Sequence, residues 1–224
     1  MAHTHPKIVD LTHPLSSGMQ IYPGDPEVRV EPATSLADDG VVVHALQLGT
    51  HTGTHLDAPS HSIADGATVD RLDLGRLAGP LHLVDVTELA QPGDRIELAQ
   101  VAAQLEQLAA GTIVVFRTDW SKRFGQPDYL EHPFLDAAIA ERLLAVGVTV
   151  VGVDTLSPDR TDATAASADL PFHEVFLGAG GVIIENLTNL SAIDTARDPW
   201  ISALPLPFTG LDGSPVRAVA MHRA

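Results

Sequence analysis

Residues 51–61 read HTGTHLDAPSH, which places three histidines and one aspartate within eleven positions. On an extended strand successive side chains alternate between two faces, so the odd-numbered residues from His51 to Asp57 would share one face. Gly53 lies between the two histidines of this face and has no side chain that could block a metal ion. A helix is disfavoured here by the glycine, by two β-branched threonines and by the proline. The stretch therefore predicts a strand end that delivers His51, His55 and Asp57 to one point.

This ligand set suits a divalent transition metal such as Zn²⁺ or Mn²⁺, because imidazole nitrogens and carboxylate oxygens bind both ions. A polar turn that merely happens to be rich in histidine is the alternative interpretation. The histidines are spaced by four and six residues, and an aspartate follows the second by two residues. That spacing favours a metal site, with His61 just past the proline.

The composition predicts a globular chain and excludes several classes of function. The 224 residues are 45% hydrophobic, which suffices for a core, and 13 basic against 29 acidic side chains give a net charge of −16. We expect no nucleic-acid partner, because phosphate binding needs a basic face. There is no apolar run of about eighteen residues to span a membrane, no resemblance to a secretory signal, and no cysteine for disulfides or thiolate sites. We expect a cytoplasmic protein that acts on a small molecule.

The order of apolar runs predicts a layered β/α fold with a mixed sheet, because strands alternate with helices in the middle and β-rich segments flank them. Strands are expected over residues 7–15, 27–32, 41–50, 81–86, 112–118, 148–154, 182–187, 201–208 and 214–222. Helices that end at glycines are expected over residues 97–111, 134–147 and 171–181. The strand at 41–50 is expected to lead straight into the histidine motif.

His173 and Glu185 are candidates for the second half of the metal site. His173 opens the short helix expected at 171–181. Glu185 lies in the apolar run VIIENL, where a carboxylate is costly to bury without a partner such as a metal ion. The alternatives are a histidine that caps its own helix and a carboxylate that faces water from an edge strand. Asp154, at the end of a buried strand, is expected to have a structural or supporting role.

Five candidate ligands exceed what one Zn²⁺ ordinarily takes from protein side chains. Two divalent metal ions, Zn or Mn, bridged by carboxylates would use all five. Such a pair would hold a bridging hydroxide, which is a nucleophile at neutral pH. His61 need not bind a metal and is better placed to pass a proton to a leaving group. The five ligands are His51, His55, Asp57, His173 and Glu185.

Six motifs are distributed over nearly the whole chain. They are YPGDP (22–26), HTGTHLDAPSH (51–61), WSKRFG (120–125), GVDTLSPD (152–159), the segment 173–185 continuing into ENLTNL (185–190), and ALPLPFTGLDGSPVRA (203–218). With these motifs the chain resembles the cyclase-like metal-dependent hydrolases, a family that includes bacterial kynurenine formamidase and isatin hydrolase. The resemblance implies an α/β fold, a swivelling β/β/α single domain over residues 1–224, that assembles as a homodimer or homotetramer.

The resemblance also implies how the ligands divide between two metal ions. One ion would take His51, His55, Asp57 and Glu185. The other would take Asp57, His173 and Glu185. Both carboxylates would then bridge the two ions.

The expected function is that of a metal-dependent amidohydrolase, specifically an arylformamidase that hydrolyses N-formylkynurenine in tryptophan catabolism. By resemblance, His61 is the general acid/base. Tyr22 stands where the formamidases carry a tryptophan that stacks on the aromatic substrate, and a tyrosine ring can also stack. A cyclic amide of the isatin type and a lactone are the alternative substrates.

Two interpretations from other classes remain open. His55, Asp57 and a distant histidine match the two-histidine, one-carboxylate pattern of non-haem iron oxygenases. That pattern leaves His51, Glu185 and His61 without a role, and it is typical of β-barrels rather than of a chain with helices in its middle. A non-catalytic metal-binding domain would keep the ligands without activity, and the intact His61 argues against it.

Overall fold

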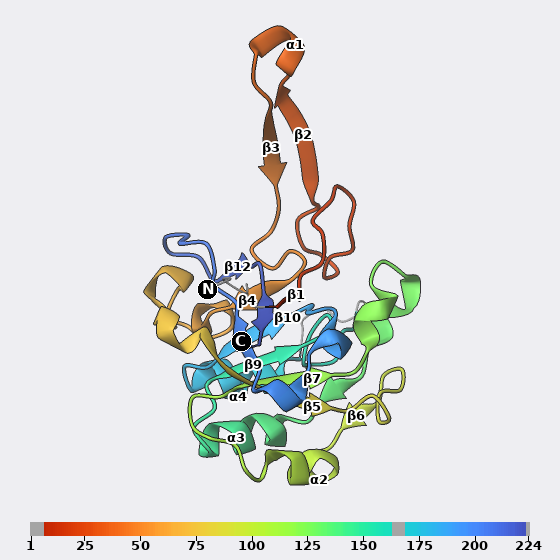
Figure 1. Cartoon of the computed structure of the whole chain (residues 1–224), viewed down its shortest axis with the longest axis vertical. Coiled ribbons are helices and arrows are strands. Elements are labelled where there is room, and N and C mark those ends of the chain that lie inside the picture. The colour runs from red at the N-terminus through yellow and green to blue at the C-terminus, as the bar shows by residue number, and fades with distance from the viewer. Residues whose placement is uncertain (1–6, 163–168, 223–224) are drawn as a thin grey trace, which may run out of the picture.

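The computed structural model describes residues 7–162 and 169–222 (Figure 1). Its main feature is a large, curled, mixed sheet with few helices, which confirms the α/β single domain expected from the sequence. The strands of this sheet are β1 (Ile8–Asp10), β4 (His55–Asp57), β5 (Ala78–Asp85), β7 (Ile113–Arg117), β9 (Val150–Val153), β10 (Val182–Glu185), β11 (Trp200–Ser202), β12 (Gly213–Pro215) and β13 (Val219–Met221). Their order across the sheet is β1-β13-β11-β5-β7-β9-β10-β4-β12.

The sheet combines a parallel centre with antiparallel flanks. Strands β5, β7, β9 and β10 run parallel to one another. All other pairings of the sheet are antiparallel, through β4 and β12 on one side and β11, β13 and β1 on the other. The chain passes from β12 at one edge to β13 near the other within a few residues. Beyond β1 and β10, the Thr188 amide donates to the Leu11 carbonyl at 3.0 Å. The two flanks are therefore drawn together and the sheet curls.

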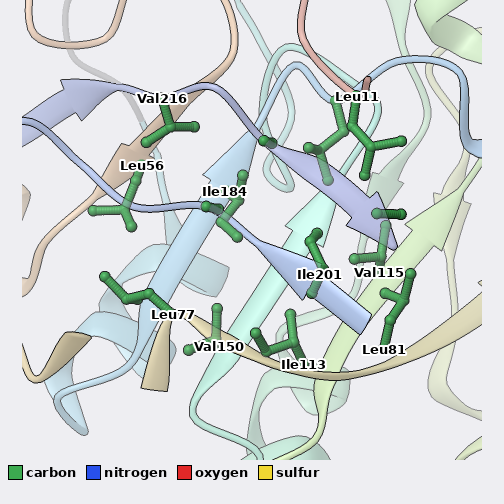
Figure 2. Packing of buried hydrophobic residues seen from close by; sticks show 14 of the residues in the cluster. Leu11, Leu56, Leu77, Leu81, Ile113, Val115, Val150, Ile184, Ile201 and Val216 are labelled. Atoms are coloured by element: carbon green, nitrogen blue, oxygen red, sulfur yellow. The ribbon is translucent and has the colours of Figure 1, made fainter. Parts of the chain in front are cut away.

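The central strands are apolar along their length because both of their faces are covered. On one face, Ile113 and Val115 join a core that the curled sheet forms together with 3-10 turns and connecting segments, and Figure 2 shows them with Leu56, Ile184 and Ile201. On the other face, the alternate residues of the same strands pack against the helices. This alternation confirms the buried strands predicted at 112–118, 148–154 and 182–187.

The helices cover the second face of the sheet and are short. They are α2 (Leu98–Val101), α3 (Ala137–Ala145) and α4 (Pro171–Gly178), drawn at the lower side of the sheet in Figure 1. A minor two-stranded sheet of β6 (Arg95–Ile96) and β8 (Phe134–Leu135) lies beside them. None of the helices within the described residues is long and apolar enough to cross a membrane.

A long hairpin arm projects from this body (Figure 1). It consists of β2 (Arg29–Thr34), the short helix α1 (Leu36–Asp39) at its tip, and β3 (Val43–Gln47). The expectation that the strand at 41–50 leads straight into the histidine motif is therefore wrong. β3 ends at Gln47, belongs to the arm, and is separated from β4 by a loop.

The helix predicted over 97–111 is also wrong in extent. It starts as expected, with a capping box between Glu97 and Gln100, but α2 ends at Val101 and a 3-10 turn follows. The reason lies at Gln104. Its backbone carbonyl lies 2.9 Å from His82 Nε2. Its side-chain amide accepts a hydrogen bond from the Asp85 N–H and donates one to the Asp85 carbonyl. These contacts to β5 replace the next helical turn.

Candidate metal centre

Strands β4 and β10 place three of the predicted ligands on one face. The strands pair antiparallel in a register that sets Glu185 opposite His55. Directly opposed residues point to the same side of a sheet, and so do residues two apart on one strand. Asp57 therefore joins His55 and Glu185, while Leu56 between them points into the hydrophobic core. The His55 Nε2 atom lies 3.2 Å from an oxygen of each carboxylate.

His51 reaches the same point by a different route from the one predicted. Residues 51–54 form a turn rather than a strand, so His51 does not share a strand face with His55. Gly53 produces this turn with a φ of +61°, and a Cβ there would lie 2.7 Å from a methyl carbon of Leu15. The glycine is thus needed for backbone conformation and packing, not to leave room for a metal. The turn brings His51 Nδ1 to 2.7 Å from Asp57 Oδ1.

His173 is supplied by the start of α4, as predicted, and is held by Asp159. The buried Asp159 carboxylate accepts hydrogen bonds from the backbone N–H groups of Phe172 and His173 and from His173 Nδ1, at 2.8, 3.0 and 2.7 Å. His173 Nε2 is left facing Asp57 Oδ2 at 3.5 Å and Glu185 Oε1 at 3.3 Å. The GVDTLSPD motif contains Asp159, but its role was not predicted.

Each of the three candidate histidine ligands has one ring nitrogen occupied by an outer acceptor. His55 Nδ1 donates to the Gly53 carbonyl at 2.7 Å, and His51 Nε2 lies 3.0 Å from Asp212 Oδ2. His173 uses Asp159 in the same way. Metal-binding histidines in proteins almost always show this pattern, because the outer acceptor fixes the tautomer and the ring orientation. The remaining nitrogens of all three rings face the carboxylates of Asp57 and Glu185.

Buried atoms without partners point to cations in this space. Among the described residues, His55 Nε2, Asp57 Oδ2 and Glu185 Oε1 are buried and have no hydrogen-bond partner. Buried polar atoms are rarely left unsatisfied. Two groups of donors, which share Asp57, each have ligand atoms within 4.8 Å of one another: His51, His55 and Asp57, and Asp57, His173 and Glu185. The donor set of nitrogens and carboxylate oxygens fits Zn²⁺ or Mn²⁺.

The electrostatics of the cluster favour positive charge. Burial lowers the pKa values of His51 and His55, but the carboxylates around them, Asp57 foremost with Asp212 beside His51 and Glu185 beside His55, together outweigh this effect and raise the pKa values to about 9 and about 10. Burial raises the pKa of Asp57, yet the histidines hold it well below its usual range. Protons on the imidazoles thus occupy the role that metal cations would fill, and metal binding would release them.

His61 and Tyr22 line the cavity above the cluster. His61 ends a 3-10 turn that begins at Pro59, and its ring centroid lies 3.9 Å from that of His51 and 5.7 Å from that of His173. The cavity has a volume of about 170 Å³. Its lining consists of Tyr22, Asp25, His51, His55, His61, Leu156, Ser157, Leu170, His173 and Glu185. Six of the seven residues predicted for the site therefore line one cavity. The seventh, Asp57, is fully buried and contacts His51, His55 and His173.

Asp154 lies outside this cluster. Its buried carboxylate accepts hydrogen bonds from the N–H and hydroxyl of Thr118 and from the N–H of Asp119, at 2.8, 2.6 and 2.8 Å. It fixes the turn after β7, a structural role of the kind expected.

Residues 9–160 match the family model described as putative cyclase. The chain belongs to the cyclase family. A kynurenine formamidase from Bacillus mycoides is 35% identical over 213 residues, which cover 94% of this chain and 95% of that one. The relatives at this level of identity carry the names of hydrolases, so the family membership and the hydrolase class expected from the motifs are confirmed.

Solved structures of family members have the same fold. An isatin hydrolase bound to the product analogue thioisatinate superposes with a TM-score of 0.85 at 26% identity and covers 98% of this chain and 93% of that one. A predicted metal-dependent hydrolase from Bacillus stearothermophilus superposes with a TM-score of 0.79 at 28% identity and covers 98% and 100%. This cyclase-family chain thus shares both its architecture and its hydrolase class with metal-dependent relatives.

Proposed function

We propose that the protein is a metal-dependent amidohydrolase that removes the formyl group from N-formylkynurenine. The observation that carries the proposal is the convergence of two donor groups, joined by Asp57, on a cavity that His61 also lines. The kynurenine formamidase relative at 35% identity supports an aromatic formamide as the substrate. By the same proposal the enzyme acts on a small molecule and needs two divalent ions, Zn or Mn.

The five ligands would divide between two ions as the resemblance implies. His51 and His55 would serve the first ion and His173 the second, with Asp57 and Glu185 available to both. The 3.2 and 3.3 Å distances from Glu185 to His55 and His173 support a shared role for this carboxylate.

Divalent ions in this position supply Lewis acidity, which polarises the scissile carbonyl and makes a water molecule acidic near neutral pH. His61 turns Nδ1 toward Asp212, so Nε2 is the nitrogen that can give a proton to the departing amine. Tyr22 offers an aromatic face on which the substrate ring stacks. Leu156 and Leu170 line the same cavity and limit the access of bulk water.

Hydrolysis of a cyclic amide of the isatin type is the second candidate. It is favoured by the close superposition on isatin hydrolase over 98% of this chain. The same residues would serve, because ring opening of a lactam also needs a polarised carbonyl and a proton for the leaving nitrogen. A lactone would differ only in its leaving oxygen.

The deciding experiment compares turnover of N-formylkynurenine and isatin by the metal-loaded protein. The expected result is formate and kynurenine, with turnover abolished by EDTA and restored by Zn²⁺ or Mn²⁺. Preferential opening of isatin would move the assignment to the cyclic amide. Turnover that survives complete metal removal would contradict a metal-dependent hydrolase. Iron-dependent oxygen uptake would instead support an oxygenase, and stoichiometric metal binding without any turnover would support a non-catalytic domain.

We further propose that the chain assembles as a homodimer or homotetramer through its hairpin arm. Within the described residues β2 and β3 pair only with each other, and a two-stranded hairpin alone is at best marginally stable in water. Val30 and Leu46 lie opposite each other in the register and are both exposed, Leu46 to 66%. Leu36 at the tip is 68% exposed. An exposed apolar surface of this kind is typical of a protein–protein contact.

The mass in solution tests this assembly. We expect light scattering to give at least twice the chain mass of 23.7 kDa for the wild type. Leu46→Glu should weaken association, because a charge would enter the contact, while Glu31→Gln on the same strand pair should not. A monomeric wild type, or an unchanged mass for Leu46→Glu, would contradict the proposal.

A further inference from the structure

The Asp212 carboxylate lies between two histidines that have different proposed roles. One oxygen, Oδ2, is 3.0 Å from His51 Nε2 and 3.3 Å from His61 Nδ1. The other, Oδ1, accepts a hydrogen bond from the Thr50 hydroxyl at 3.1 Å. A single carboxylate oxygen thus contacts both a candidate metal ligand and the candidate acid/base.

The backbone of Asp212 is fixed to the strand that carries the ligands. β12 begins at the next residue and pairs with β4 in a register that sets Gly213 opposite Asp57. The Asp212 carbonyl also accepts a hydrogen bond from the Ala58 N–H at 2.8 Å. The backbone of Asp212 is therefore anchored beside the strand that carries His55 and Asp57.

Gly213 allows this close approach. A Cβ at this position would lie 2.6 Å from His51 Cε1, so any side chain would push the strand away from the imidazole. Because Gly213 has no side chain, the strand can approach His51 closely enough for the Asp212 carboxylate to lie within hydrogen-bond distance of the His51 and His61 rings. The conformation of this segment is thus matched to the histidines and not only to the sheet.

The carboxylate also determines which nitrogen of His61 faces the cavity. A carboxylate can only accept, so His61 Nδ1 must carry a proton and Nε2 remains for the substrate. Carboxylates paired with catalytic histidines hold the ring in the productive tautomer and stabilise its protonated form. The His61 side chain is 28% exposed, so packing alone does not fix its ring.

We propose that Asp212 is a positioning residue that orients His61 for proton donation to the leaving nitrogen. This rests on the hydrolase function proposed above. His61 Nε2 first takes a proton from the water that attacks the formyl carbon. As the C–N bond breaks, its electron pair passes to nitrogen, which receives this proton from His61 Nε2. Water supplies the oxygen that ends on the formyl carbon, so the products are formate and the free amine. Because Asp212 Oδ2 also contacts His51, it links the orientation of the proton donor, His61, to that of a candidate metal ligand.

The test compares two substrates that differ in their need for an acid. The nitrogen of formanilide cannot leave as an anion and must be protonated, whereas 4-nitrophenyl formate releases 4-nitrophenolate, which leaves without a proton. For Asp212→Asn with full metal loading, we expect kcat on formanilide to fall about 10²-fold or more and kcat on the ester to fall less than about 10-fold. KM should change little for either substrate. His61→Ala should show the same pattern.

A double variant and a matched control complete the experiment. If Asp212 acts through His61, the double variant Asp212→Asn/His61→Ala should be no slower on formanilide than His61→Ala alone. Asp70→Asn is the control. The Asp70 carboxylate accepts a hydrogen bond from the N–H of Gly210, which lies in the same loop as Asp212, and Asp70 is not among the residues that contact His51 or His61. It should leave both substrates unaffected.

Three results would overturn the positioning role. They are an equal loss on both substrates for Asp212→Asn, a further loss in the double variant, and a loss of metal that accounts for the whole effect. The last would show that Asp212 acts on metal binding, either through His51 or as a ligand, since the donor atoms of His51, His61 and Asp212 also lie within 4.8 Å of one another. A wild type that hydrolyses neither formanilide nor N-formylkynurenine would instead refute the proposed function itself.

Discussion

Replacing Asp159 by alanine separates the two proposed metal ions, because Asp159 supports only His173. The buried carboxylate accepts three hydrogen bonds, two from the start of α4 and one from His173 Nδ1. Its removal leaves three buried N–H donors without an acceptor, and each unsatisfied donor costs about 1–3 kcal/mol of stability. Rearrangement of the surrounding structure and entry of water recover part of this cost. We therefore expect the unfolding free energy of the metal-free protein to fall by about 3–5 kcal/mol.

The effect on metal binding is more specific. Without its outer acceptor, the His173 ring is free to change tautomer and orientation, and losses of this kind typically weaken metal affinity about 10–100-fold. The ion bound by Asp57, His173 and Glu185 should weaken by this factor, whereas the ion bound through His51 and His55 should keep its affinity. Competition with a coloured chelator at increasing metal concentration would resolve the two dissociation constants.

Two further variants make this prediction decisive. Glu174→Gln removes an exposed negative charge at the start of the same helix and should leave both affinities unchanged. Asp159→Asn keeps the volume and one acceptor oxygen, so it should fold even if the alanine variant does not. If a folded Asp159 variant bound both ions as tightly as the wild type, the role assigned to Asp159 would be refuted.

Three more predictions follow from the site and its surroundings. His61→Ala should retain both ions and lower kcat on N-formylkynurenine about 10²–10⁴-fold, and a normal rate at normal metal content would refute the proton role. EDTA should lower the melting temperature, because the buried carboxylates of Asp57 and Glu185 would lose their counter-charge; an unchanged value would count against metal binding. Burial lowers the pKa of His13 to about 4, so the stability it contributes is complete above pH ~6.5 and lost as the pH falls toward 4. Urea titrations would measure the unfolding free energy of the wild type and of His13→Gln at both pH values. The excess of the wild type over the variant should be about 1–3 kcal/mol larger at pH 7 than at pH 4, and an equal excess at both would contradict this.

The sequence was sufficient where one physical constraint dominates. The strands β7, β9 and β10 were predicted because a strand buried on both faces must be apolar throughout. Glu185 was predicted as a ligand because a carboxylate in such a strand requires a compensating partner. The structure brings it next to His55 as that reasoning expects.

The sequence was insufficient where distant segments decide the outcome. Nothing in the sequence around Gln104 shows that its carbonyl faces His82 instead of continuing a helix. Asp159 and Asp212 lie 14 and 161 residues from the histidines they contact, so no periodic spacing links them. The route of His51 through a turn depends on the positive φ of Gly53 and not on strand alternation.

The central claim is that two cations lie between His51, His55, Asp57, His173 and Glu185. The most direct test is anomalous diffraction at the metal edge from crystals grown with Zn²⁺ or Mn²⁺. We predict two peaks, one beside His51 and His55 and one beside His173, with Asp57 in contact with both. Density that shows no metal in this cavity, or that shows His173 and Glu185 turned away from it, would contradict the claim.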